Sequence, residues 1–177
     1  TSSFQYKIPG ISALPPHDRP SASPKPRDNG YLCTMAGIYL HIPFCKKACH
    51  YCDFHFSTSF SYEGQILESM HRELKLRAGY LGESNVETIY FGGGTPSVLE
   101  AAEIQFLLDA IIAAFPVSSA AEITLEANPD DLSAQKVKQL RETSVNRFSI
   151  GTQSFFDEDL KWMNRAHTAG EAEDSIK

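Results

Sequence analysis

The sequence predicts an α/β fold built on a parallel sheet. Short apolar strands alternate with amphipathic helices from residue 35 to the end of the chain, and this alternation is typical of parallel strands joined by helical crossovers. The first, third and fourth of these strands also alternate apolar and polar side chains, whereas the strands of a doubly wound sheet are usually apolar on both faces. A polar interior surrounded by helices indicates an open or partial (β/α) barrel of about four βα units.

The first two units each consist of a strand followed by a helix. Runs of β-branched and aromatic residues predict strands at 37–43 (GIYLHIP) and 86–92 (VETIYFG). Apolar residues recur at helical spacing over 62–81, and the more apolar segment 98–115 predicts a second helix. The serine and the glutamate of segment 97–100 (SVLE) are spaced as a capping box, so we expect them to begin the second helix.

The third and fourth units repeat this order. Residues 121–127 (AEITLEA) and 146–152 (NRFSIGT) predict strands. Between them, residues 130–143 predict a helix whose first turn is acidic, which suits the positive end of a helix dipole. After the last strand, we expect one helix to begin near Phe156 and another near Gly170.

Residues 1–34 differ in composition from the rest of the chain. They contain six of the ten prolines, several Ser and Gly residues and little periodicity, which predicts a disordered Pro/Ser-rich leader. Met35 follows directly, so we expect translation to begin there and the leader to be non-native. A complete barrel typically needs ~250 residues, so residues 35–177 are expected to be the amino-terminal part of a longer core domain.

The composition argues against several classes of protein. The formal net charge of −6 argues against a surface for nucleic acid or anionic membranes. No apolar run approaches the ~20 residues of a membrane helix, and residues 1–34 lack the apolar centre of a secretory signal. Four cysteines in 177 residues make a poor disulfide framework. We therefore expect a cytoplasmic protein whose clustered thiols bind a metal.

Three of the four cysteines lie within segment 41–54 (HIPFCKKACHYCDF). Cys45, Cys49 and Cys52 have the spacing C-x3-C-x2-C. Three thiolates from one loop can hold three irons of a cubane cluster and leave the fourth iron open to a small molecule, as catalytic metal sites leave a position open.

Other uses of these cysteines remain open at this point. A structural zinc site needs four ligands, and the fourth would come from His50, His55 or Cys33. An electron-transfer [4Fe-4S] cluster usually takes four cysteines as well, but Cys33 lies in the predicted leader. A further alternative is three unrelated buried thiols, because free cysteine is often simply buried.

Polar and glycine-rich positions follow the predicted strands. Glu126, Thr152 and Gln153 fall at the carboxyl ends of strands, where α/β proteins form ligand sites. Segment 91–97 (FGGGTPS) lets the backbone approach a ligand closely, although it is neither a dinucleotide fingerprint nor a P-loop. His41 faces the polar side of the first strand, where a structural and a functional role are both open.

Five motifs occur in a fixed order along the chain: IYLHIPFCKKACHYCDF, FGGGTPS, ITLEANP, RFSIGTQSF and MNRAH. The cysteine spacing, with Tyr51 before the last cysteine, is the signature of radical S-adenosylmethionine (SAM) proteins. Together the motifs resemble the oxygen-independent coproporphyrinogen III oxidase group of that superfamily. Within this group, CDF and the later NRAHTAGEA are most similar to the heme chaperone branch. The resemblance covers Met35 to Lys177 nearly end to end.

The resemblance implies a [4Fe-4S] cluster on Cys45, Cys49 and Cys52, with SAM chelating the fourth iron through its amino and carboxylate groups. Reduced clusters of this family cleave SAM to methionine and a 5'-deoxyadenosyl radical, while the protein positions the cofactor. The residues that match the family's contacts with SAM are Tyr39, Tyr51, Gly93, Gly94, Thr95, Glu126, Gln153 and Arg165.

One position departs from the oxidase pattern. The oxidases carry a further cysteine two residues after the last cluster ligand, whereas this chain has Phe54. That cysteine is not a cluster ligand, so the expected cluster stands, but its absence puts decarboxylation of coproporphyrinogen in doubt. The similarity to heme chaperones implies heme as cargo and a respiratory hemoprotein as partner, with the heme-binding residues outside this chain.

Three hypotheses from different classes follow. The first is a heme chaperone, which Phe54 favours. The second is a radical SAM enzyme that makes protoporphyrinogen IX by oxidative decarboxylation. The third is a structural zinc or ferredoxin-like module, which requires a fourth protein ligand and predicts no response to SAM.

Overall fold

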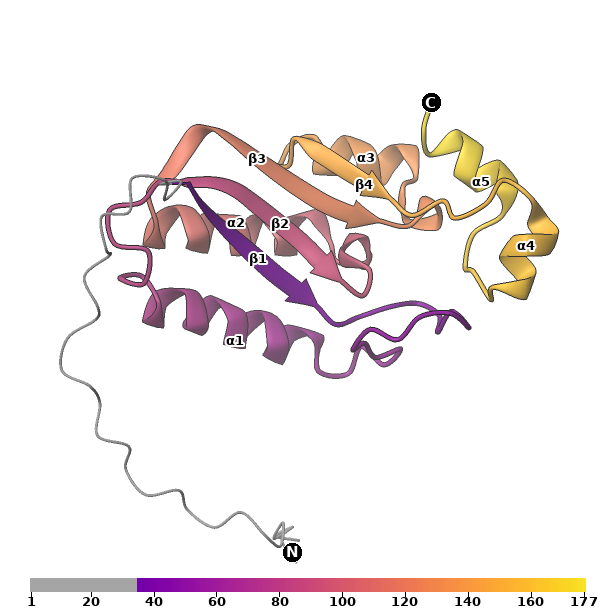
Figure 1. Cartoon of the computed structure of the whole chain (residues 1–177), viewed down its shortest axis with the longest axis horizontal. Helices are drawn as coiled ribbons and strands as arrows, with labels where there is room; N and C mark the ends of the chain where they lie inside the picture. The colour runs from indigo at the N-terminus through magenta and orange to yellow at the C-terminus, as the bar shows by residue number, and fades with distance from the viewer. Residues whose placement is uncertain (1–34) are drawn as a thin grey trace, which may run out of the picture. The chain divides into compact units, whose positions relative to one another are not determined.

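Four parallel strands form one sheet in the order β1-β2-β3-β4, as the alternating pattern predicts. The structure, a computed structural model, describes residues 35–177, and Figure 1 shows the helices running between successive strands. The predicted leader and Cys33 lie outside the described residues. In chain order the elements are β1 (Ala36–Ile42), α1 (Glu63–Leu76), β2 (Val86–Gly93), η1 (Pro96–Val98), α2 (Ala101–Ala114), β3 (Val117–Ala127), η2 (Pro129–Asp131), α3 (Ala134–Leu140), β4 (Arg147–Ile150), α4 (Asp157–Trp162) and α5 (Ala169–Asp174).

One face of the sheet packs against helices. The register aligns Leu40, Phe91, Leu125 and Phe148 across the four strands, and the first three of these side chains are buried. Leu67 of α1 and several apolar residues of α2 join the same core, and both helices lie along this side of the sheet in Figure 1. Burial of this apolar face supplies the main force that holds the strands in register.

The opposite face of the sheet is polar. The register places Tyr39, Tyr90, Thr124 and Arg147 in one row across the strands. The rings of Tyr39 and Tyr90 stack with centroids 6.0 Å apart, and the Tyr90 hydroxyl donates a hydrogen bond of 2.7 Å to Glu126 Oε1. The predicted separation into one apolar and one polar face is confirmed for β1 and β3, and it directs polar groups to the side that a barrel encloses. The same prediction is wrong for β4, in which Phe148 is 37% exposed and no residue is buried.

The first helix is shorter than its apolar pattern predicts. Helix α1 ends at Leu76, and the chain continues through turns in which Gly82 has a φ of 59°. Leu81 still packs against the core from this turn. A leucine at helical spacing therefore contributes to the core without belonging to the helix.

The predicted capping box is wrong. Ser97 lies in η1, and α2 is instead capped by Glu100, which exchanges hydrogen bonds with Glu103 in a capping box one turn later. The Ser97 hydroxyl is used elsewhere: it donates to Asp131 Oδ2 at 2.5 Å and accepts from the Asn128 amide at 3.1 Å. The loop after β2 is thereby joined to the loop after β3.

The last two units also differ in detail from the prediction. The single helix expected over 130–143 is divided into η2 and α3, because Ser133 caps a new helix by accepting from the Lys136 amide at 3.2 Å. Strand β4 ends at Ile150, so Gln153 follows the strand and does not belong to it. No helix within residues 35–177 combines the length and the apolar character that a membrane span requires.

Candidate functional site

The three cysteines lie in a long loop between β1 and α1, which we call the cysteine loop (residues 43–62). Its beginning is fixed to the sheet, because the amides of Gly94 and Thr95 donate to the carbonyl oxygens of Ile42 and Phe44 at 2.8 and 2.7 Å. Phe44 is buried and forms an isolated bridge with Ser57. The loop therefore leaves β1 in a fixed direction, at the carboxyl end of the sheet.

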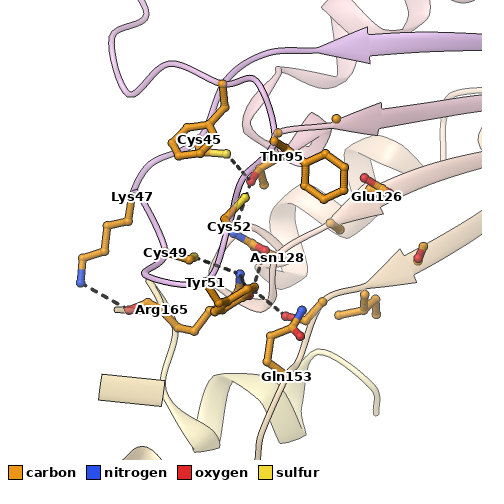
Figure 2. A pocket seen from close by; sticks show the side chains of 18 residues that line it. Cys45, Lys47, Cys49, Tyr51, Cys52, Thr95, Glu126, Asn128, Gln153 and Arg165 are labelled. Atoms are coloured by element: carbon orange, nitrogen blue, oxygen red, sulfur yellow. Dashed lines mark hydrogen bonds between the residues drawn. The ribbon is translucent and has the colours of Figure 1, made fainter. Parts of the chain in front are cut away.

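A cavity of about 370 Å³ opens at this end of the sheet. Figure 2 shows the three cysteines on one side of it, with groups from the loops after β2, β3 and β4 around them. All the residues assigned to the cluster and to SAM line the cavity except Tyr39. The full lining consists of Cys45, Lys47, Cys49, Tyr51, Cys52, Phe54, Phe56, Gly93, Gly94, Thr95, Glu126, Ala127, Asn128, Ser149, Ile150, Gly151, Gln153 and Arg165.

The glycines of the FGGGTPS segment bring the backbone of this loop against the cysteine loop. Gly93 has a φ of 111°, which a residue with a side chain rarely adopts. A Cβ on Gly94 would lie 2.5 Å from the Phe44 carbonyl oxygen and 3.0 Å from Cys45 Sγ. Gly94 is therefore required for close approach to a cysteine sulfur. Thr95 follows and donates from its hydroxyl to the same Cys45 Sγ at 3.4 Å.

Arg165 connects the cysteine loop to the loops after β3 and β4. Its Nη1 contacts Cys49 Sγ at 3.5 Å and the Tyr51 hydroxyl at 3.2 Å. Its Nη2 donates to Asn128 Oδ1 at 2.7 Å and to the Gly151 carbonyl oxygen at 2.6 Å. Arg165 Nε is buried without a hydrogen-bond acceptor among the described residues. A partly buried guanidinium beside Cys49 and an open cavity suits an anionic ligand.

The segment from Trp162 to Arg165 also forms hydrogen bonds with the cysteine loop. His50 Nδ1 lies 2.8 Å from the Trp162 carbonyl oxygen, at the end of α4. Asn164 has a φ of 57°, and its Nδ2 donates to the Ala48 carbonyl oxygen at 2.8 Å. Short polar side chains tolerate this left-handed conformation better than others. These contacts hold the middle of the cysteine loop, between the first and the last cysteine.

The thiols have the features expected of cluster ligands. All three are free, and all three line the same cavity. Burial raises the pKa of the Cys45 thiol, and the hydrogen bond from Thr95 and the charge of Arg165 only partly oppose this rise. A bound metal ion would favour the thiolate form. Within residues 35–177, no three His, Cys, Asp or Glu side chains converge on one ion. In a cubane cluster each thiolate binds a different iron, so its ligands are more widely spaced.

The loop after β4 carries Gln153 in an unusual backbone conformation. The φ of Gln153 is 63°, and β4 has already ended at Ile150, so Gln153 lies beyond the strand. The preceding Thr152 presents its carbonyl oxygen 2.9 Å from Nε2 of His167. His167 is 3% exposed, and burial lowers its pKa. The buried imidazole therefore supports the loop from which Gln153 reaches the cavity.

Tyr39 and His41 lie on the polar face of β1, away from the cavity lining. The Tyr39 hydroxyl and His41 Nδ1 are 3.3 Å apart, and His41 Nε2 lies 3.1 Å from the carbonyl oxygen of His55 in the cysteine loop. Tyr39 is 58% exposed. Tyr39 is the one residue assigned to SAM that does not line the cavity. Its role, like the roles of the other assigned residues, stays a prediction.

Sequence reasoning missed several residues of this site. Asn128 contacts Arg165, Thr95 and Ser97, and Lys46 pairs with both Asp130 and Asp131. The signal for Asn128 was its place directly after a strand, next to Glu126, in a segment already recognised as a motif. No spacing rule signals Lys46, because its partners lie far along the chain.

Comparison with known proteins identifies the family of this chain. A family model described as the radical SAM superfamily matches residues 39–177. The heme chaperone HemW of Bacillus subtilis is 41% identical over 136 residues, which are 75% of this chain and 36% of that protein. HemW of Escherichia coli is 39% identical over 145 residues, 79% of this chain and 38% of that protein. The chain thus spans somewhat more than a third of the length of these relatives.

Animal and structural relatives extend the match. The mitochondrial radical S-adenosyl methionine domain-containing protein 1 of Mus musculus is 34% identical over 140 residues, 78% of this chain and 32% of that protein. Among solved structures, the radical SAM enzyme coproporphyrinogen III oxidase (HemN) of Escherichia coli superposes with a TM-score of 0.70 at 30% identity, over 80% of this chain and 32% of that one. The predicted partial radical SAM barrel is confirmed by this likeness. Because the family model matches residues 39–177, which include the whole cysteine loop and strands β2 to β4, the chain belongs to the radical SAM superfamily.

Proposed function

We propose that the protein is a heme chaperone of the radical SAM superfamily that works in the cytoplasm and delivers heme to respiratory hemoproteins. Cys45, Cys49 and Cys52 hold a [4Fe-4S] cluster, and SAM occupies the adjoining cavity. The observation that carries the proposal is the convergence of three free thiols from one loop on a cavity at the carboxyl ends of four parallel strands. When bound, the reduced cluster supplies cleavage of SAM to methionine and a 5'-deoxyadenosyl radical.

The chain's own residues bind and orient SAM. Gly93 and Gly94 line the cavity, and as glycines they let the backbone approach the ligand closely. Arg165 offers a positive charge beside Cys49 for the carboxylate of SAM. Glu126 accepts from the ribose hydroxyls or the ammonium group, and Gln153 contributes a further polar contact.

Heme as cargo rests on the relatives and on one residue. The two bacterial relatives named above are heme chaperones. Phe54 stands where the oxidases carry their extra cysteine, and it is 71% exposed at the rim of the cavity. A phenyl ring cannot perform thiol chemistry, so the chemistry for which an oxidase would use that cysteine is missing at this position.

A second candidate function is the oxidative decarboxylation of coproporphyrinogen III to protoporphyrinogen IX. The structural likeness to HemN supports it, because the same cavity would hold the cofactors of either reaction. A structural zinc or ferredoxin-like module has less support. Within residues 35–177, no group of three His, Cys, Asp or Glu side chains is placed to bind a single zinc ion. The adjoining cavity would also have no ligand in this reading.

The test uses the full-length gene product, purified and reconstituted with iron and sulfide without oxygen. One sample receives dithionite, SAM and coproporphyrinogen III, and both protoporphyrinogen and 5'-deoxyadenosine are measured. A parallel sample is titrated with heme and then mixed with apo-hemoprotein acceptors. Tight heme binding and transfer without decarboxylation is the expected result. Formation of protoporphyrinogen together with 5'-deoxyadenosine would identify an oxidase instead, and a cluster spectrum indifferent to SAM would refute both.

A further inference from the structure

The three cysteine sulfurs have different hydrogen-bond environments. Cys45 Sγ accepts from the Thr95 hydroxyl at 3.4 Å, and Cys49 Sγ accepts from Arg165 Nη1 at 3.5 Å. No hydrogen bond to the sulfur of Cys52 is present within residues 35–177. Hydrogen bonds to cluster sulfurs favour the more negative, reduced state and so raise the reduction potential. The donors to Cys45 and Cys49 are therefore the groups through which this chain tunes a cluster.

Asn128 connects these two donors. Its Oδ1 accepts from Arg165 Nη2 at 2.7 Å, and its Nδ2 donates to Thr95 Oγ1 at 3.5 Å. The side-chain amide thus uses its acceptor on one donor and its N–H on the other. Figure 2 shows Asn128 lying between Thr95 and Arg165 on the side of the cysteines. The five residues make a continuous path from one cysteine sulfur to another.

The backbone of Asn128 is itself held in place. Its amide donates to the hydroxyl of Ser97 at 3.1 Å, and Ser97, which is 1% exposed, donates onward to Asp131. Asp131 pairs with Lys46, the residue that follows the first cysteine. Because this second path runs from the Asn128 backbone to Lys46 in the cysteine loop, Asn128 cannot shift without moving groups that the fold already fixes.

We propose that Asn128 is a positioning residue that sets the hydrogen bonds to Cys45 and Cys49 and thereby the reduction potential of the bound cluster. The role in the potential rests on the proposed cluster. The positioning of Thr95 and Arg165 against the thiols is a property of the metal-free chain, so it can be tested without iron or SAM.

Two substitutions distinguish the two hydrogen bonds of the Asn128 side chain. Asn128→Ala removes both the acceptor for Arg165 and the donor to Thr95. Asn128→Asp keeps an acceptor for Arg165 and places a charge there, but it has no N–H for Thr95. The control is Asn146→Ala. The Asn146 side chain also makes two hydrogen bonds: its Oδ1 accepts from the Ile123 amide, and its Nδ2 donates to the Ala121 carbonyl oxygen. It lies directly before β4 and away from the thiols.

The first measurement is differential alkylation of the folded, metal-free protein, read by mass spectrometry, with Cys52 as the internal reference. Asn128→Ala should increase labelling of Cys45 and Cys49 relative to Cys52 several-fold, whereas Asn128→Asp should increase labelling of Cys45 alone. Asn146→Ala should leave the ratios unchanged. Unchanged ratios in both Asn128 variants would overturn the proposed positioning, whatever the protein's function proves to be.

The second measurement is the midpoint potential of the reconstituted cluster in the full-length protein, by redox titration followed by electron paramagnetic resonance. Both Asn128 variants should have a more negative potential than the wild type, with the larger shift in Asn128→Asp because it adds a negative charge. Asn146→Ala should match the wild type. Equal potentials in all four proteins would disprove the tuning role, whereas failure of the wild type to hold any cluster would disprove the proposed function itself.

Discussion

Nε2 of His167 lies 2.9 Å from the carbonyl oxygen of Thr152, and Nδ1 of the same ring is buried with no hydrogen-bond partner among the described residues. Because a carbonyl oxygen only accepts, Nε2 carries the proton and Nδ1 is left with a buried lone pair. Protonation of Nδ1 would place a charge in a buried site. Burial therefore lowers the pKa of His167 from its ordinary value of 6.5.

The first prediction concerns the pH dependence of stability. A histidine whose pKa is lower in the folded state stabilises the fold fully above its unfolded pKa, and this contribution is lost as the pH falls through the folded pKa. The free energy of unfolding should therefore decrease below about pH 6.5. His167→Phe keeps the ring volume and removes the titration, so its denaturant midpoint should depend less on pH between about 5 and 7. Parallel curves for the two proteins would contradict this prediction.

The second prediction concerns the cluster ligands. Replacement of Cys45, Cys49 or Cys52 by Ala should abolish the brown absorbance of the reconstituted protein, because each thiolate holds a separate iron. Cys33→Ala is the matched control and should leave the absorbance unchanged. Iron and sulfide analysis of each variant checks that loss of colour reflects loss of the cluster. A colourless Cys33 variant would mean that a fourth cysteine is a ligand and that no iron is open to SAM.

The sequence was sufficient for the parallel sheet, because the alternation of strands and helices is a local pattern, whereas the site assignments rested on the resemblance and stay predictions. The period of two in β1 and β3 placed Leu40 and Leu125 in the core and Glu126 on the polar face. It was insufficient where the chain makes long-range contacts. Ser97 matched a local capping rule, but its partners are Asn128 and Asp131, which become neighbours only after β2 and β3 pair.

Residues after the strand ends were harder to place than those inside the strands. Gln153 was expected at the carboxyl end of a strand, but β4 ends at Ile150 and Gln153 itself has a φ of 63°. Gln153 still lines the cavity, because the buried contact between His167 and the preceding residue determines where the turn points. Strand periodicity ends with the ladder of hydrogen bonds, so it carries no information about loops beyond it.

The third prediction concerns the close contact between Gly94, in the FGGGTPS segment, and Phe44, in the cysteine loop. Gly94→Ala would place a Cβ 2.5 Å and 2.9 Å from the backbone oxygen and nitrogen of Phe44, and backbone cannot rotate away as a side chain would. This overpacking should lower the free energy of unfolding by about 1–3 kcal/mol and reduce cluster retention. Gly64→Ala in α1 is the control, because its Cβ would meet nothing within 4 Å.

The control variant has an expected direction of its own. Alanine has a higher helix propensity than glycine, so Gly64→Ala should be neutral or stabilising by up to about 1 kcal/mol. Thermal unfolding and the iron content after gel filtration distinguish the two substitutions. Equal stability and equal iron content in both variants would show that the cysteine loop can move away from the FGGGTPS segment without cost.

The fourth prediction concerns the ion pair between Lys46 and Asp131. The Asp131 side chain is 3% exposed, whereas that of Lys46 is 46% exposed and also contacts Asp130 at 2.8 Å. Burial lowers the pKa of Lys46, but its hydrogen bonds with both aspartates outweigh this effect and raise the pKa above its ordinary value. The two partners therefore depend on the pair to different degrees, and the buried carboxylate depends on it more.

This asymmetry predicts unequal effects of removing either charge. Lys46→Met leaves a buried carboxylate without its cation, which should cost about 1–3 kcal/mol of unfolding free energy after allowance for the solvent that reaches the pair. Asp131→Asn keeps an acceptor for the Ser97 hydroxyl and leaves an ammonium group that water and Asp130 still solvate, so its cost should stay below about 1 kcal/mol. Urea unfolding of the two variants and the double variant gives the coupling energy. A larger loss in Asp131→Asn than in Lys46→Met would mean that the carboxylate, and not the ion pair, fixes the cysteine loop to the loop after β3.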